Sequence, residues 1–449
     1  MDNETLEFDL ETLVQEGHLD TIRERFEQLH PADIAAMINE LEAREGWTAL
    51  ALLELAEQAE VFGYLDHDFQ VELATVAPRA KLARIVVEMN ADERADLYNE
   101  LSDEQREALM PGLVQAERED IRRLAAYEEG TAGAIMTSDY ATLPPDLTAT
   151  QALTKLRREA PDKETIYRAY VVDEDRKLIG SVRLQDLITA PARAKVGGIM
   201  ETNTLAVAVS DDQEDVARKI ARYDILALPV VDADGRIVGI VTHDDALDVI
   251  EEETTDDFHR VGTVTNLASS VGEATILMLY RARIVWLVLL VFGNIFSGAG
   301  IAYFEDTIAA HLALMFFLPM LIASGGNAGS QAATLMVRAL ATGDVEFRDW
   351  GYLLLRELAV ALALGLTMAF AVSFLGFWRG DASLAATVSL SMVLIVVVGS
   401  LIGMSLPFAL ARFNLDPATA SAPLVTSIAD VVGVMIYFSI ATSFLSLPS

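Results

Sequence analysis

The chain has 449 residues with 33 basic and 67 acidic side chains, and residues 280–449 hold only seven and nine of these. Residues 1–279 therefore carry 26 basic and 58 acidic side chains, which predicts a strongly acidic soluble part followed by a membrane part. This acidity argues against nucleic acid as a partner, and the absence of cysteine excludes disulfides, thiolate metal sites and cysteine catalysis.

Residues 1–128 are expected to form an all-α cytoplasmic domain. The N-terminus, MDNETLEFDL, is acidic and has no apolar core, so it does not resemble a signal peptide. Apolar residues recur at three- and four-residue spacing in segments 32–43 and 82–89. His30-Pro31 and the Ser102–Gln105 segment are helix start signals.

An acid-rich face of this domain lies around Asp92, Glu93 and Asp96. Such a face is usually only solvated, and metal contact is the alternative interpretation.

Residues 134–250 contain an internal repeat, because YVVDEDRKLIGSVRLQDLI (170–188) is echoed by PVVDADGRIVGIVTHDDAL (229–247). Each copy predicts a strand, a turn, a second strand and a helix. The pair resembles tandem CBS domains, an α/β regulatory module that often binds adenine nucleotides between its repeats. Thr242 and Asp245 match the pattern that contacts ribose and phosphate in such modules, whereas the first copy has Arg183 in place of the threonine. The sequence therefore leaves two interpretations of this pair: it binds ATP, or it has a purely structural or ion-sensing role.

Residues 244–257 hold eight acids in fourteen positions, with no Lys or Arg. On a helix, Asp245, Asp248, Glu252 and Asp256 would share one face, where like charges repel one another. Dense carboxylates without His or Cys suit a hard cation such as Mg²⁺ or Ca²⁺. We therefore expect cations to neutralise this helix, which forms part of an acidic connecting segment over 251–278.

Five apolar spans are predicted at 283–304, 312–337, 352–378, 384–410 and 419–445, within a pore domain over 279–449. Six of the seven arginines near these spans fall on one side and only Arg379 falls on the other. The positive-inside rule then predicts a multi-pass plasma (inner) membrane protein with a cytoplasmic N-terminal part and an external C-terminus.

The last span carries Asp430 near its middle. A carboxylate at membrane depth costs several kcal/mol, so it normally faces water or a partner charge. Pro423 is expected to remove one helical hydrogen bond and to free the carbonyl of Thr419. These features favour a cation path over a packing helix with a stray protonated aspartate.

The second span carries three glycines, Gly325, Gly326 and Gly329, together with Asn327 and Gln331. Small residues allow close packing of membrane helices. The two amides need a partner or water at that depth. The sequence favours two roles for this segment equally, packing against another helix and lining of the pore.

The order of helical domain, CBS pair, acidic helix and five spans resembles the MgtE family of magnesium channels over essentially the whole chain. The most specific segments are GGNAGSQAATLMVRALATGD (325–344) and DPATASAPLVTSIADVVG (416–433). One departure is Ala422, where some members have Asn before the proline.

This resemblance implies a homodimer whose single pore is lined by the second and fifth spans. Asp430 of both copies would hold a hydrated Mg²⁺, Asp416 would lie near the gate, and the acidic helix would act as a plug. It also implies regulatory Mg²⁺ between the helical domain, the CBS pair and the plug. The matching carboxylates are Asp92, Asp96, Asp212, Glu214, Asp224, Asp245, Asp248, Glu253, Asp256 and Asp257.

The predicted function is a magnesium channel, not an enzyme, that is closed by cytoplasmic Mg²⁺. No G-x-x-x-x-G-K-[ST] loop supports pumping driven by ATP. An ion-coupled divalent cation exchanger or symporter is the main alternative, because Asp430 could titrate. An intramembrane protease, an anion transporter and a sensory receptor are less compatible with these residues.

Overall fold

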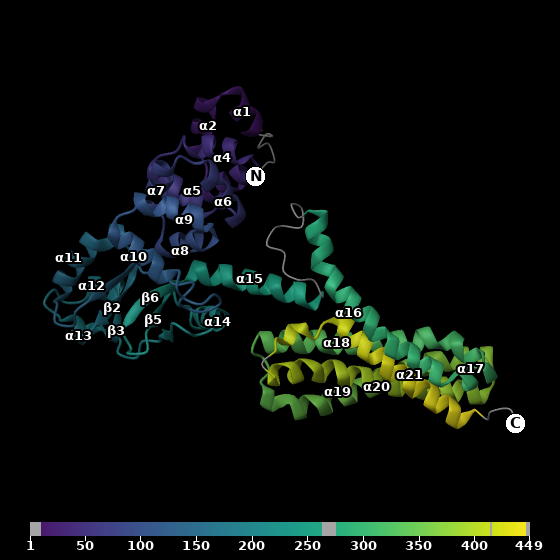
Figure 1. Ribbon diagram of the computed structural model, residues 1–449. Coiled ribbons are helices and arrows are strands. Elements are labelled where there is room, and N and C mark those ends of the chain that lie inside the picture. Colours follow the sequence, from purple (N-terminus) through teal and green to yellow (C-terminus); the bar gives the residue numbers. More distant parts are fainter. Residues whose placement is uncertain (1–9, 263–274, 414, 446–449) are drawn as a thin grey trace. The chain divides into compact units, whose positions relative to one another are not determined.

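The computed structural model describes residues 10–262, 275–413 and 415–445 (Figure 1). Its N-terminal part is a run of short helices, as the apolar spacing predicts. Pro31 begins one helix and Ser102 caps another: the Gln105 amide donates to the Ser102 hydroxyl (3.4 Å), and the Ser102 amide donates to Oε1 of Gln105 (2.9 Å). These helices are α1 (Leu10–Glu16), α2 (Leu19–Phe26), α3 (Pro31–Asn39), α4 (Ala43–Leu50), α5 (Leu55–Gly63), α6 (His67–Val76), α7 (Arg79–Glu88), α8 (Ala91–Glu100), α9 (Asp103–Leu109), η1 (Met110–Gly112) and α10 (Gln115–Leu124).

Two small sheets follow and confirm the internal repeat. In each, the first strand pairs in parallel with the second, which pairs antiparallel with the third. The strands are β1 (Tyr140–Leu143), β2 (Thr165–Val172) and β3 (Leu178–Arg183) in one sheet, and β4 (Val207–Ala208), β5 (Ala227–Val231) and β6 (Ile237–Thr242) in the other. Their helices are α11 (Ala149–Glu159), η2 (Ala160–Asp162), α12 (Leu184–Thr189), α13 (Val196–Ile199) and α14 (Gln213–Tyr223).

The turns between paired strands are equivalent in the two repeats. Asp173 and Asp232 each accept two backbone amide hydrogen bonds within their own turn. The left-handed position is held by Gly235 in the second repeat, with φ of 78°, and by Arg176 in the first, with φ of 64°. A non-glycine residue there is locally unfavourable.

The acidic segment forms a helix, α15 (His243–Val261), as predicted. The chain divides into two units, residues 1–252 and 253–449, and the boundary falls within α15. The finer bounds of 1–128, 134–250, 251–278 and 279–449 remain predictions, and residues 263–274 lie outside the described residues.

The second unit contains the five apolar helices that the sequence predicts, each long enough to cross a membrane. Within the unit, α18, α20 and α21 pack together, α19 packs on α20, and α16 packs on α21 (Figure 1). The elements are α16 (Ile276–Tyr303), α17 (Glu305–Ala310), α18 (Ala313–Ala341), η3 (Phe347–Asp349), α19 (Trp350–Arg379), α20 (Ala382–Arg412), η4 (Pro417–Thr419) and α21 (Ala422–Phe444).

Glycines bring the backbones of α18 and α20 into contact. A Cβ at Gly399 would strike the carbonyl oxygen of Gly325, and one at Gly403 would strike that of Gly329. Both helices thus carry glycines four residues apart at the crossing, which is the small-residue packing typical of membrane helices. Gly325 and Gly329 therefore serve packing.

Candidate ion path and regulatory carboxylates

Asp430 lies in the middle of α21, and its side chain is half-buried. No hydrogen bond or ion pair reaches its carboxylate within the part of the chain that the structure describes. Ala429 and Gly433 beside it are buried. A carboxylate in an apolar helix with no protein partner requires water, a proton or a cation.

Pro423 does not interrupt the last helix, so that expectation was wrong. The α-helix begins at Ala422, and Pro423 occupies its first turn, where the missing amide would have no helical partner. The Thr419 carbonyl is not free either, because the Ser421 amide donates to it at 2.7 Å.

Asp416 is held by two contacts within its unit. Its Oδ1 accepts the Ala418 amide at 2.8 Å and so caps η4, while its Oδ2 forms an ion pair with Arg260 near the end of α15. Arg260 also lies 3.7 Å from Asp256. The predicted gate residue is therefore tied to the acidic helix through an arginine.

The amides of α18 follow a different face from its packing glycines. Asn327, Gln331 and Thr334 are exposed, at spacings of four and three residues along the helix. An exposed polar stripe on a membrane helix is unfavourable in lipid and suits a water-filled path or a second protein surface.

Glu357 is an acidic side chain in a membrane helix that the sequence reasoning missed. It lies on α19, and the Ser400 hydroxyl of α20 donates to its Oε1 at 2.6 Å. Its signal in the sequence is a single glutamate within the apolar run LLLRELAVALAL (353–364).

In the first unit, carboxylates from distant segments come together. Asp92, Glu93 and Asp96 of α8 lie near Asp245 at the start of α15 and near Glu164, just before β2. These five residues are called the acidic cluster below. Glu164 was not predicted.

Burial and mutual repulsion raise the pKa values in the acidic cluster. Desolvation is the main cause and neighbouring carboxylates add to it, so the pKa values of Asp92, Glu93, Asp96 and Asp245 rise to about 7, and that of Glu164 to about 9. Oxygen atoms of Asp92 and Glu164 are buried without a hydrogen-bond partner. Protons or cations are needed to stabilise this arrangement.

Other predicted ligands have local roles. Asp212 caps α14 by accepting the amides of Glu214 and Asp215, Glu214 pairs with Arg218, and Asp224 ends α14 in a left-handed conformation. Partial burial, and to a smaller extent the acidic neighbours Asp244 and Glu251, raise the pKa of Asp248.

Glu253 and Asp257 lie on α15 with Asp256. Among the described residues, no three His, Cys, Asp or Glu side chains are arranged to hold a bare metal ion. The metal assignments of all these carboxylates remain predictions.

Thr242 and Asp245, the predicted nucleotide contacts, engage each other. The Thr242 hydroxyl and amide both donate to Oδ2 of Asp245, the amide at 3.3 Å. Asp245 also belongs to the acidic cluster, which would repel a phosphate chain.

Comparisons with known proteins agree with this architecture. Residues 318–440 match a family model described as "Divalent cation transporter", 29–130 match the "MgtE intracellular N domain", and 132–193 and 196–252 match the CBS domain. The chain is 41% identical to the magnesium transporter MgtE of Thermus thermophilus over 98% of both chains, and 31% identical to that of Bacillus subtilis over 96% of both.

Two solved structures resemble the first half. The cytosolic domain of "the Mg2+ channel MgtE in complex with ATP" aligns with a TM-score of 0.51 at 41% identity, covering 54% of this chain and 98% of that one. The "soluble part of a magnesium transporter" gives 0.50 at 33% identity, covering 54% and 96%.

The combination of helical domain, CBS pair and five membrane helices defines a multi-pass transport protein for divalent cations. The chain belongs to the MgtE family of magnesium transporters.

Proposed function

We propose that the chain forms a homodimeric Mg²⁺ channel that cytoplasmic Mg²⁺ closes. The observation that carries conduction is the Asp430 carboxylate, which lies mid-helix in a membrane span without a protein partner among the described residues. Two copies of α21 and of the polar stripe on α18 would line a pore between subunits. Only Ala282 and Gly300 of α16 are buried within one chain, which leaves a large apolar surface for lipid and for the second subunit.

The proposed permeant ion is largely hydrated Mg²⁺. This ion dehydrates reluctantly and usually keeps several waters, so carboxylates, hydroxyls and carbonyls can hold it through its hydration shell. Contacts of that kind are weak enough to release the ion, which conduction requires.

The proposed sensor is the acidic cluster together with the acids of α15. Mg²⁺ would neutralise carboxylates that otherwise repel one another and so hold the helical domain, the CBS pair and α15 together. Because Mg²⁺ is commonly held by one or two carboxylates and water, regulation does not need a preformed site with three protein ligands. The proposed regulatory ligands are those that the resemblance implies: Asp92, Asp96, Asp212, Glu214, Asp224, Asp245, Asp248, Glu253, Asp256 and Asp257.

The proposed orientation places the acidic unit in the cytoplasm and the C-terminus outside, on the basis of the arginine distribution. ATP binding between the CBS repeats is also proposed, supported by the ATP complex of the similar cytosolic domain.

Limited proteolysis of the full chain tests the sensor. Wild-type protein should become protected within residues 1–262 as Mg²⁺ rises to millimolar levels. Replacing Asp92, Asp96 and Asp245 by Asn removes the repulsion, so this variant should be protected without Mg²⁺. The control replaces three exposed glutamates, Glu24, Glu72 and Glu88, by Gln. If the proteolysis of the wild-type protein does not change with the Mg²⁺ concentration, the proposal is contradicted.

A coupled divalent cation exchanger or symporter is the second candidate. Glu357 adds a carboxylate in a membrane helix to Asp430, and its hydrogen bond with Ser400 places it within the α19–α20 contact. Two such carboxylates could carry protons. The reversal potential of Mg²⁺ currents distinguishes the two candidates. A reversal potential that is independent of the pH gradient favours the channel, and one that changes with the pH gradient favours the exchanger.

A further inference from the structure

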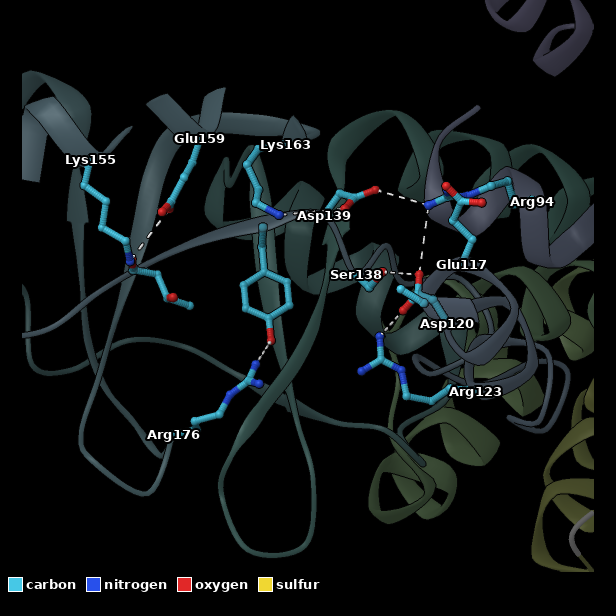
Figure 2. A pocket seen from close by; sticks show the side chains of 13 residues that line it. Arg94, Glu117, Asp120, Arg123, Ser138, Asp139, Lys155, Glu159, Lys163 and Arg176 are labelled. Atoms are coloured by element: carbon cyan, nitrogen blue, oxygen red, sulfur yellow. Dashed lines mark hydrogen bonds and ion pairs between the residues drawn. The ribbon is translucent and has the colours of Figure 1, made fainter. Parts of the chain in front are cut away.

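A cavity of about 640 Å³ lies in the first unit, between the helical residues and the first sheet. Its walls come from α8, α10, β1, α11 and the turn after β2, and Figure 2 shows the side chains converging on it. None of its lining residues belongs to the acidic cluster or to the Thr242–Asp245 pair. Its volume is in the range of small-molecule sites, which is roughly 300–1,000 Å³.

The lining is rich in cations for so acidic a unit. Arg94, Arg123, Lys155, Lys163 and Arg176 all line the cavity. The unit as a whole has a large excess of acids, so this gathering of basic groups is local. Arginine and lysine at one cavity are the groups that recognise phosphate.

Arg94 is a buried cation with unused capacity. Its side chain is only 10% exposed, and its guanidinium lies 3.5 Å from Asp139 and 3.9 Å from Asp120. Dashed lines in Figure 2 mark both ion pairs. Its buried Nε has no hydrogen-bond partner. A buried charged donor without a partner costs free energy, which an acceptor in the cavity would recover.

Arg176 is a second cation with unused capacity, and unlike Arg94 it is exposed. Its guanidinium donates to the Tyr140 hydroxyl at 3.1 Å, and it forms no ion pair among the described residues. The turn does not need this side chain, because the second repeat has Gly235 in the equivalent left-handed position. The guanidinium is therefore available to a ligand.

Four carboxylates line the cavity, and all are engaged: Glu117 accepts the Val114 amide at 3.0 Å, and the other three contact cations. Asp120 accepts from Arg123 and from the Ser138 hydroxyl, the latter at 2.8 Å. Asp139 lies 3.8 Å from Lys163, and Glu159 lies 3.7 Å from Lys155. A metal ion would have to displace these cations, whereas an anion would meet unused donors.

We propose that this cavity binds a phosphorylated small molecule, with Arg94, Lys163 and Arg176 contacting its phosphate groups. The volume leaves room for an organic group or a second phosphate beside the first. Because the walls come from both α8–α10 and the first CBS repeat, the ligand would fasten the helical domain to the sheets. This inference does not depend on the ion path.

Calorimetric titration of the full-length protein with pyrophosphate, inorganic phosphate, ATP and adenosine tests the proposal. At this cavity we expect one pyrophosphate per chain, weaker inorganic phosphate and no adenosine, and we expect ATP to bind here in addition to the proposed site between the CBS repeats. Arg176→Gly should keep the turn while weakening binding about tenfold or more, the usual effect of losing a charged hydrogen bond. Lys163→Gln, at a partly exposed side chain, is the second variant. Arg157→Gln, exposed on α11 outside the cavity, is the control.

The variants separate this cavity from the proposed nucleotide site. ATP binding that falls in Thr242→Val but not in Arg176→Gly or Lys163→Gln would overturn the assignment. So would the lack of phosphate or pyrophosphate binding at millimolar concentration, or equal binding by the wild type and both cavity variants. The thermal unfolding of Arg176→Gly and Lys163→Gln is the folding control. If it is unchanged, a loss of binding comes from the lost contact in the cavity and not from misfolding.

Discussion

Arg260, near the C-terminal end of α15, forms an ion pair with Asp416, the residue that caps η4 just before the last membrane helix. The pair links the acidic helix to the entrance of the proposed pore. Neither residue is fully exposed, and Arg260 also lies near Asp256. The contact gives α15 a direct means of holding α21 in one position.

Arg260→Gln should weaken closure by Mg²⁺. The exposed share of the pair limits its contribution, so the Mg²⁺ concentration that halves uptake should rise about two- to fivefold. Mg²⁺ uptake into proteoliposomes at graded internal Mg²⁺ measures this. Arg348→Gln removes an exposed arginine paired with Glu346 in the same unit and should have no effect. An unchanged Arg260→Gln response would show that the pair does not contribute to gating.

The acidic cluster predicts a pH dependence of stability. Its carboxylates have pKa values raised to about 7, and for Glu164 to about 9, so the folded unit binds protons more tightly than the unfolded chain. The stability that these groups contribute is then fully present below the ordinary carboxyl pKa of about 4. It falls as the pH rises from there through about 7, and for Glu164 through about 9.

In EDTA, the unfolding temperature of the first unit should decrease from pH 6 to pH 8.5. Added Mg²⁺ should raise the unfolding temperature again. The increase should be largest at the highest pH, where Mg²⁺ replaces the missing protons. Differential scanning calorimetry of the full chain measures both effects. A flat profile in EDTA would mean that the cluster is neutralised by other means.

The glycine crossing of α18 and α20 predicts a steric effect. Gly403→Ala places a methyl group against the Gly329 carbonyl, and overpacking of this kind costs about 1–3 kcal/mol. The variant should unfold at lower temperature in detergent. Gly298→Ala on α16, with open space at its Cβ position, is the matched control. Equal stability of the two variants would contradict the close crossing.

Glu357→Gln separates the two candidate functions. It keeps the hydrogen bond from Ser400 but removes a titratable group. A channel should conduct Mg²⁺ through this variant at nearly the wild-type rate. A proton-coupled exchanger should lose its response to a pH gradient. Uptake with and without an imposed pH gradient measures the difference.

The sequence was sufficient wherever the signal is local. Helix start signals at Pro31 and Ser102, the strand repeat and the five apolar helices all depend on spacing within one segment. Asp430 was recognised as a carboxylate in an apolar run, whereas Glu357, which stands in a similar run directly after Arg356, was overlooked.

Contacts between distant segments were not predictable from spacing. Glu164 joins Asp92 in the acidic cluster although 72 positions separate them, and one sequence does not show which helix faces Gly325. Arg260 likewise looks like a charge at the end of an acidic helix until Asp416 is brought beside it. Pro423 was misread because the start of the last helix was placed a few residues too early.

The most direct test of the proposed function is Mg²⁺ uptake by Asp430→Asn in proteoliposomes, beside the wild type and Asp381→Asn, which lies at the start of α20. Asn has nearly the size of Asp but cannot hold a cation by charge. We expect uptake to fall to background in Asp430→Asn while protein yield and oligomeric state match the wild type. Uptake at the wild-type rate would contradict the claim that passing ions meet this carboxylate.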